Sequence, residues 1–367
     1  MATRQVSLVL SGGVALGAYQ AGAYAALHEH QDLRPQRLAG SSIGAVNAAL
    51  IAGNGPEQRI ERLRGFWNAV TAEPGLLGAP WGPIWTGGPW RHAFNWWSVL
   101  QARLFGRAGV FQPRMPELML KNVNSVYDLA PMRRNVERFV DFDRLNGGEV
   151  GVAVVTTDIE TGEEVVFDTG RGDRIGPDHL LATCGFLPDF APLEIGGRLL
   201  GDGGLVANAP VEAVLLATGG GDHLCFVVDL FSPEGGRPRT LEEAAGRRWD
   251  LLFGNQSRQR LRSLEREVRL RWALNRISER LGSEATGDPE LEAALAEGSD
   301  RTVTLLHLSY RAPVHEAGPE KPFDFGRASL GERWEAGELD MAAAVRLAKK
   351  GERPTMGISV RRVRRQE

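Results

Sequence analysis

The sequence predicts an α/β fold, a three-layer sandwich in which helices cover both faces of a mostly parallel central sheet, followed by a mainly helical C-terminal extension. Short apolar runs alternate with helical stretches over the first two-thirds of the 367 residues, a pattern typical of such sheets. Glycine-rich segments follow apolar runs at the predicted carboxyl ends of strands, where ligands bind in this architecture. The chain is long enough for two domains and a large core.

The predicted strands are short apolar runs bounded by turn residues. They comprise Val6–Leu10, Gly151–Thr156, Val165–Asp168 and His223–Leu230. The predicted helices between them comprise Ala18–His30, Ala45–Gly53 and Val211–Thr218. A hairpin with a Gly-Gly turn is expected over residues 193–200, which places Asp202 just after its second strand.

The composition changes from Arg237 onward, where charged and helix-forming residues dominate. Residues 241–281 predict one or two helices, and residues 282–300 predict a polar loop with a short helix. A further strand is expected over Arg301–Tyr310, and helices over Phe323–Gly337 and Met341–Lys350. We therefore predict one domain at residues 1–235 and a mainly helical extension at residues 236–367.

Ser42 is the candidate nucleophile. It lies at the centre of Gly40-Ser41-Ser42-Ile43-Gly44, a G-x-S-x-G pentad between a predicted strand and a predicted helix. Glycines two positions before and after a serine permit a sharp strand-to-helix turn that exposes the hydroxyl. Small residues also mark ordinary turns, so the pentad alone leaves a structural role open.

Two further segments favour chemistry at Ser42. The first, Ser11–Gly17, is a glycine-rich turn that opens a helix and presents backbone N–H groups suited to a developing oxyanion. The second is Asp202-Gly203-Gly204, an aspartate beside two glycines that can approach other backbone closely. Together the three segments supply a nucleophile, a base and oxyanion donors, the minimum set for acyl transfer.

These segments resemble those of the patatin-like lipid acyl hydrolases. Residues 10–22 look like the family's oxyanion loop, residues 40–47 its nucleophile elbow, residues 157–162 its strand-turn-strand segment and residues 202–210 its aspartate motif. The resemblance implies a Ser–Asp dyad without histidine, with Ser42 as nucleophile and Asp202 as base. We expect no metal or cofactor. It also implies an oxyanion hole at Gly12, Gly13 and Val14, supported by Gly17, Gly40, Gly44, Gly203 and Gly204.

The chain departs from the family's pattern at two positions of the oxyanion loop. Val14 stands where a third glycine is usual, and Leu16 stands where many members have arginine or lysine. A β-branched residue resists positive φ, so the loop either keeps φ negative at Val14 or is strained. The peptide N–H survives the replacement, but its direction decides whether it can bind an oxyanion. Leu16 resembles a variation of one bacterial branch that also carries a C-terminal extension.

The composition limits the cellular locations and binding partners that we expect for this protein. The net charge of −3 gives no reason to expect nucleic acid as a partner. Cys184 and Cys225 are the only cysteines, and both lie in apolar stretches where buried free thiols are expected. No secretory signal is visible, and no apolar run reaches the ~18 residues needed to span a bilayer. We expect a cytoplasmic protein whose contact with membranes, if it has any, is peripheral.

Residues 66–111 form an aromatic-rich insertion interrupted by glycine and proline. It holds Phe66, Trp67, Trp81, Trp85, Trp90, Phe94, Trp96, Trp97 and Phe111. Three interpretations stay open. The rings pack a loop-rich layer over the sheet, they form a lid or the wall of an acyl pocket, or they contact a membrane interface.

Six arginines of the segment 241–281 fall within about 80° of arc on a helix, with apolar residues on both sides. They are Arg258, Arg262, Arg266, Arg269, Arg276 and Arg280. Such a ridge suits anionic lipid head groups and predicts peripheral contact with an anionic membrane. The alternative is a solvated face, or one paired with acids elsewhere in the fold.

The predicted activity is that of a serine lipid acyl hydrolase of the phospholipase A, lysophospholipase or carboxylesterase type, with a lipid or fatty acyl ester as substrate. Two alternatives remain. An α/β-hydrolase would use Ser42 with an acid and a late histidine, and His307 and His315 lie late enough. A binding or regulatory module would result if Val14 has disabled the oxyanion hole.

Overall fold

The computed structural model describes residues 4–72, 90–114, 123–215, 221–282, 288–313, 316, 318, 321–351, 354 and 356–363, with backbone alone for residues 90–96. Within them, one sheet of nine strands forms the centre, in the order β11-β10-β9-β1-β2-β5-β8-β7, and β6 also pairs with β5. The run from β11 to β5 is parallel, and β6, β7 and β8 are antiparallel additions at one edge. The mostly parallel sheet predicted from the sequence is confirmed.

Where the sequence predicts a strand, the observed bounds agree to within two residues. The strands are β1 (Gln5–Leu10), β2 (Arg37–Ser41), β5 (Gly151–Asp158), β6 (Glu164–Asp168), β7 (Leu193–Ile195), β8 (Arg198–Asp202), β9 (Asp222–Asp229), β10 (Thr302–Ser309) and β11 (Ile358–Arg362). A separate two-stranded sheet joins β3 (Gln112–Pro113) and β4 (Tyr127–Asp128). Gly196 and Gly197 both have positive φ in the turn between β7 and β8, as the predicted Gly-Gly hairpin requires.

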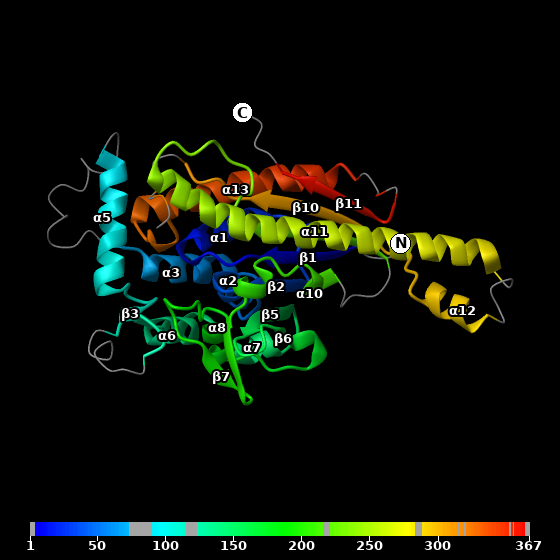
Figure 1. Ribbon diagram of the computed structural model, residues 1–367, viewed down its shortest axis with the longest axis horizontal. Helices are drawn as coiled ribbons and strands as arrows, with labels where there is room; N and C mark the ends of the chain where they lie inside the picture. The colour runs from blue at the N-terminus through cyan, green and yellow to red at the C-terminus, as the bar shows by residue number, and fades with distance from the viewer. Residues whose placement is uncertain are drawn as a thin grey trace.

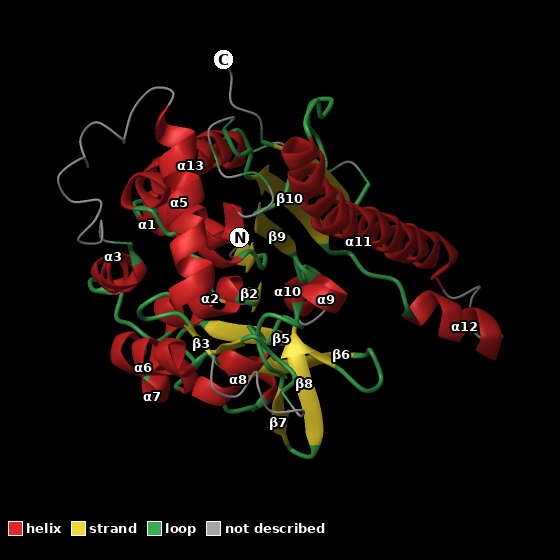
Figure 2. Cartoon of the chain, turned by 60° about the vertical axis from the view of Figure 1, so that its left-hand side comes forward, coloured by secondary structure: helices red, strands yellow, loops and turns green. Residues whose placement is uncertain are grey.

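Helices cover both faces of the sheet, because alternate residues of each strand point to opposite sides. Leu8 of β1 belongs to a core with helices α1, α2, α3 and α13, whereas Val9 belongs to a second core with α10 and α11. Figure 2 shows these two groups of helices on opposite sides of the strands. The helices are α1 (Gly17–His28), α2 (Ile43–Ala52), α3 (Arg59–Val70), α5 (Trp90–Phe105), α6 (Ala130–Phe139), α7 (Phe142–Asn146), α8 (Pro177–Ala182), α9 (Gly204–Ala207), α10 (Glu212–Leu215), α11 (Leu241–Leu281), α12 (Pro289–Ala296) and α13 (Arg327–Lys349). The predicted three-layer sandwich is confirmed.

The C-terminal segment is mainly helical, as predicted, but it also completes the sheet. Strands β10 and β11 extend it beyond β9, and α13 packs against α1 (Figure 1). The two helices approach so closely that a Cβ on Gly337 would lie 1.9 Å from the Tyr19 carbonyl oxygen. Residues 338–340 continue α13, so the two helices predicted there are one. The boundary at residue 235 stays a prediction.

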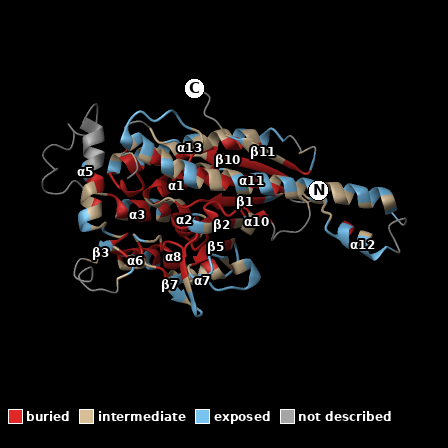
Figure 3. Cartoon of the chain, in the orientation of Figure 1, coloured by how far each residue is buried: buried red, intermediate tan, exposed pale blue. Residues whose placement is uncertain are grey.

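Burial follows the layers. Figure 3 shows buried residues concentrated in the central strands and in the helices packed on them, whereas α12 and the distal part of α11 are largely intermediate or exposed. Helix α11 is a single helix of 41 residues that continues past the sheet toward α12 (Figure 1). In the described residues, no helix combines the length and the apolar character that crossing a bilayer requires.

Candidate functional site

Ser42 occupies a strained turn between β2 and α2. Its φ of 54° and ψ of −130° lie in a region that non-glycine residues rarely adopt. The turn forces α2 close to the preceding loop, since a Cβ on Gly44 would lie 2.1 Å from the Leu10 carbonyl oxygen. This is the sharp strand-to-helix turn that the pentad predicts.

Thr183, which follows α8, supports that turn. The Ser42 N–H donates to Thr183 Oγ1 at 2.8 Å, and the same hydroxyl donates to the Val155 carbonyl oxygen on β5. One buried side chain therefore fixes the backbone of Ser42 relative to the neighbouring strand. No sequence pattern predicts this role of Thr183, because it is a lone threonine after a short helix.

Asp202 is the last residue of β8, and its side chain reaches Ser42. Its carboxylate accepts the Gly204 N–H at 2.6 Å, and Asp202 and Ser42 line the same cavity. Burial raises the pKa of Asp202 from 3.8 to about 7, and the nearby Ser42 hydroxyl and Gly204 N–H offset only part of that rise. The structure therefore brings together two residues that the sequence places 160 positions apart.

The glycine-rich loop faces the same hydroxyl, and its three candidate N–H groups differ. The Gly12 N–H donates to Asn208, to the backbone oxygen at 3.2 Å and to Oδ1 at 3.1 Å. The N–H groups of Gly13 and Val14 have no acceptor within the described part of the chain. Gly12 thus anchors the loop, and the next two residues present free donors.

Val14 has a positive φ, which is the strained one of the two conformations that its sequence context left open. Its φ is 51°, and among the described non-glycine residues only Ser42 shares a positive φ. A β-branched side chain in this region costs on the order of 1–3 kcal/mol. Both strained residues line one cavity, so strain in the described backbone is concentrated at the candidate site.

The supporting glycines named from the sequence all lie at close approaches around this site. A Cβ added to any of these glycines would lie within 3 Å of an atom of another residue. The glycine and the residue it would meet are Gly17 and Ile43, Gly40 and Ala45, Gly44 and Leu10, Gly203 and Val155, and Gly204 and Asp202. Any side chain at these positions would push apart the segments that carry Ser42 and Asp202.

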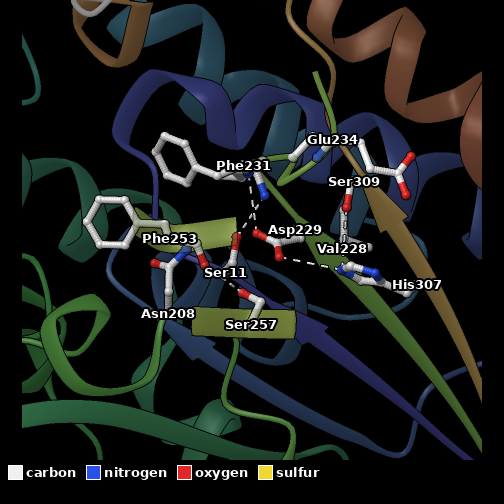
Figure 4. A network of polar contacts seen from close by, with 12 residues as sticks. Ser11, Asn208, Val228, Asp229, Phe231, Glu234, Phe253, Ser257, His307 and Ser309 are labelled. Carbon is white, nitrogen blue, oxygen red and sulfur yellow. Dashed lines mark hydrogen bonds and ion pairs between the residues drawn. The ribbon is translucent and has the colours of Figure 1, made fainter. Parts of the chain in front are cut away.

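Buried polar side chains join the glycine-rich loop to its surroundings. Ser11 Oγ accepts the Leu230 N–H at 2.9 Å, and Figure 4 shows Ser11 beside Val228 and Asp229 at the end of β9. Gln20 Nε2 donates to the Ser11 carbonyl oxygen at 2.8 Å.

The network continues into α2 and α3. Asn47 donates to Gln20 Oε1 at 3.1 Å and accepts the Trp67 indole N–H, also at 3.1 Å. Each of these groups would be unsatisfied if its partner were lost, so the network fixes the loop. A buried amide in the apolar helix α2 was the sequence signal for it.

A cavity of about 100 Å³ opens above Ser42 and Asp202, with a lining that is mostly apolar. Phe66 and Trp67 of α3 form part of the wall. Trp249 and Phe253 of α11, stacked on each other, form another part together with Phe323 from the segment before α13. The C-terminal segment therefore contributes directly to the candidate site.

The described aromatic residues of the insertion lie in different surroundings. Phe66 and Trp67 line the cavity, Phe111 is in the core, and Trp97 is 47% exposed. Trp81 and Trp85 lie outside the described residues, as do the side chains of Trp90, Phe94 and Trp96.

A charged pair lies in the mostly apolar lining. Arg103 Nη1 lies 2.5 Å from Asp189 Oδ1, and the guanidinium stands 3.7 Å from the centre of the Phe323 ring. The Asp189 carboxylate in the cavity wall is therefore paired.

His307 does not reach Ser42. It lies in β10, three strands from β2, a separation of about 14 Å at the usual strand spacing. Its Nε2 lies 3.4 Å from Asp229 Oδ2 (Figure 4), and no histidine lines the cavity among the described residues. His315 lies outside the described residues. The geometry at His307 therefore gives no support to a Ser-Asp-His triad.

Comparisons with known proteins place the chain in a family. A family model described as patatin-like phospholipase matches residues 8–215, more than half of the chain, and a model described as patatin phospholipase matches residues 252–356. None of the curated protein sequences compared with the chain matches it.

Two solved structures illustrate the distant likeness. VipD from Legionella pneumophila is 14% identical with a TM-score of 0.38, over 91% of this chain and 67% of that one. ExoU of the type III secretion system of Pseudomonas aeruginosa, solved with SpcU, is 14% identical with a TM-score of 0.32, over 95% of this chain and 80% of that one.

We predict that Asp202→Asn stabilises the fold at neutral pH. The folded-state pKa near 7 lies above the ordinary value of 3.8, so the stability that the neutral carboxyl contributes is present below 3.8 and lost as pH rises through 7. Removing the ionisation should raise the free energy of unfolding above pH 7 by up to about 4 kcal/mol. Urea unfolding of both proteins across this range measures the difference. A gain that is the same at acidic and at neutral pH would contradict this cause.

Proposed function

Because the chain belongs to the patatin-like phospholipase family, a family of lipid hydrolases, we propose that it cleaves acyl esters of lipids through a dyad of Ser42 and Asp202. Phospholipase A, lysophospholipase and carboxylesterase activities all fall within this proposal. The observation that carries it is the contact of the Ser42 hydroxyl with a buried carboxyl whose pKa is about 7, beside two free backbone N–H groups.

The proposed reaction has two halves. Asp202 accepts the Ser42 proton as Oγ attacks the ester carbonyl, and the N–H groups of Gly13 and Val14 stabilise the oxyanion. The alcohol leaves with the proton, and the acyl group stays on Ser42. A water molecule then gives a proton to Asp202 and attacks the acyl-enzyme. The bond from the acyl carbon to Ser42 Oγ breaks, Asp202 returns the proton to Oγ, and the fatty acid is released. In this scheme Gly12 holds the loop through Asn208.

The pKa of Asp202 suits this role. A carboxylate of ordinary pKa is a weak base near neutral pH, whereas one with a pKa near 7 combines the ionised form with adequate basicity. Burial is the main cause of the shift, so the apolar walls that would hold an acyl chain also tune the proposed base.

We propose residues 1–235 as the catalytic domain and residues 236–367 as an extension that completes the substrate cavity. Trp249, Phe253 and Phe323 support the second part, since they line the cavity over Ser42. We also propose a cytoplasmic location, which the two buried free thiols, Cys184 and Cys225, support.

We further propose peripheral contact with anionic membranes through the arginine ridge. Arg262, Arg266, Arg269, Arg276 and Arg280 are exposed along α11, although Arg269 and Arg276 also pair with glutamates of the same helix. Arg258 is half-buried beside the sheet. Exposed guanidinium groups in a row suit an anionic surface.

A second function has one observation in its favour. Val14 is strained, so a loop that misdirects its N–H would leave a lipid-binding or regulatory module with weak catalysis. The φ of 51° is nevertheless one that glycine adopts freely, and it leaves the N–H free of protein acceptors. This favours the hydrolase.

Ser42→Ala and Asp202→Asn should each abolish turnover of short p-nitrophenyl esters, because each removes one partner of the proton transfer. Wild type should also react with a fluorophosphonate at Ser42. His307→Ala serves as the matched control and should retain activity. Turnover that survives Ser42→Ala would remove the mechanism, and a folded wild type that neither turns over nor labels would favour the binding module.

Val14→Gly should change kcat/KM by no more than a few fold, because valine already holds a backbone conformation open to glycine. A misdirected oxyanion donor would instead cost on the order of 10² in rate. Ester hydrolysis by Val14→Gly, Val14→Ala and wild type decides between them. A rise in kcat/KM of about 10² in Val14→Gly alone would show that valine has weakened the oxyanion hole.

Replacing all six ridge arginines with glutamine should reduce co-sedimentation with anionic liposomes and leave binding to neutral liposomes unchanged. The ridge contributes charge rather than apolar contact, so salt should reduce wild-type binding in the same way. Equal binding by both proteins to anionic liposomes would eliminate the membrane role.

A further inference from the structure

A second cavity, of about 280 Å³, lies between α11, β10 and β11 and shares no lining residue with the cavity above Ser42. It sits at the carboxyl ends of the parallel strands β9, β10 and β11, the edge of an α/β sheet where ligands bind. Its walls come from the loop after β9, the end of β10, the end of β11 and one face of α11. Its lining is more polar than that of the first cavity, and charged side chains form a large part of it.

Positive charge dominates its lining. Four guanidinium groups, from Arg258, Arg262, Arg311 and Arg362, face two carboxylates, from Glu234 and Glu265. Glu234 lies between two of the arginines, 2.7 Å from Arg311 Nη2 and 3.0 Å from Arg362 Nη1. The single negative charge of Glu234 therefore balances only one of the two positive charges of Arg311 and Arg362.

The second carboxylate is engaged outside the cavity. Glu265 Oε1 lies 2.6 Å from Arg269 Nη2, one turn further along α11. Arg269 does not line the cavity. The charge of Glu265 is therefore already balanced, and the lining keeps an excess of positive charge.

Arg258 and Arg262 have no carboxylate partner in the described part of the chain. They lie four residues apart on α11, so their side chains project from one face of the helix. The Nε atom of Arg258 is buried and has no hydrogen-bond partner among the described residues. A buried guanidinium N–H without an acceptor is costly, and a bound anion would satisfy it.

Neutral donors complete the lining. Ser232 and Ser309 contribute hydroxyl groups, and the His307 ring contributes a further polar group. Figure 4 shows His307, Ser309 and Glu234 together, with the ring held by Asp229. Hydroxyl and guanidinium donors converging from several elements suit a group with several oxygen acceptors.

We propose that this cavity binds a phosphate group of a phosphomonoester, held by Arg258 and Arg262. A dianion with three terminal oxygens matches two free guanidinium groups and the nearby hydroxyls, whereas a carboxylate would occupy one guanidinium and leave the other unpaired. The phosphate belongs either to a soluble metabolite or to a lipid head group such as that of phosphatidic acid. The site is independent of the chemistry at Ser42.

Inorganic phosphate is the probe for the test. Calorimetric titration at constant ionic strength should show saturable binding to wild type at millimolar concentrations. The double variant Arg258→Gln/Arg262→Gln should bind at least about tenfold more weakly, because charge-assisted hydrogen bonds are lost. Arg266→Gln is the matched control, one turn further along α11, and should bind as wild type does. Retained fluorophosphonate labelling of Ser42 would show that each variant is folded.

Two results would overturn the proposal. They are no saturable binding by wild type and equal binding by wild type and the double variant. Vesicles of phosphatidylcholine with and without phosphatidic acid identify the source of the phosphate. Binding that requires phosphatidic acid and is competed by inorganic phosphate assigns a lipid head group, and phosphate binding without such vesicle binding assigns a soluble phosphomonoester.

Discussion

The contact between the buried carboxyl of Asp202 and the hydroxyl of Ser42 is the constraint on which the rest of the structure depends. Burial raises the pKa of Asp202 to about 7, so the protein loses stability by ionising it at neutral pH. The rest of the fold must therefore be stable enough to hold the ionised Asp202 carboxylate in its buried position. The Gly204 N–H and the pairing of β8 with β5 supply part of that stability. The burial that causes this loss of stability also raises the pKa of Asp202, which makes it a base suited to neutral pH.

The same logic explains the polar residues buried around the site. Thr183 and Asn208 each link two segments that the sequence separates by more than 100 positions, at Ser42 and Gly12. A buried polar group lowers the stability of the fold little when it is hydrogen-bonded and much when it has no partner. These bonds therefore favour one arrangement of the loops. The C-terminal segment adds to this arrangement, because Trp249 of α11 contributes to the apolar wall of the cavity that Asp202 lines.

Local patterns in the sequence were sufficient for much of this picture. The G-x-S-x-G pentad predicted the turn at Ser42, and the alternation of apolar runs predicted the parallel sheet, because both depend on neighbouring residues. Thr183 and Trp249 escaped prediction, since their roles arise from contacts between distant elements. Strand β11 was missed because its residues, Ile-Ser-Val-Arg-Arg, show no apolar run. The arginine ridge was recognised as one face of a helix, but only the structure separates Arg258, beside the strand ends, from the exposed remainder.

The central claim, that Ser42 gains its reactivity from ionised Asp202, is tested most directly by the rate of fluorophosphonate labelling as a function of pH. The rate should rise with pH, with a midpoint near 7, and then level off, because the base acts only when its carboxyl has lost the proton. Asp202→Asn should label far more slowly and lose this midpoint. A rate in wild type that is flat across neutral pH, or one that is unchanged in Asp202→Asn, would contradict the account.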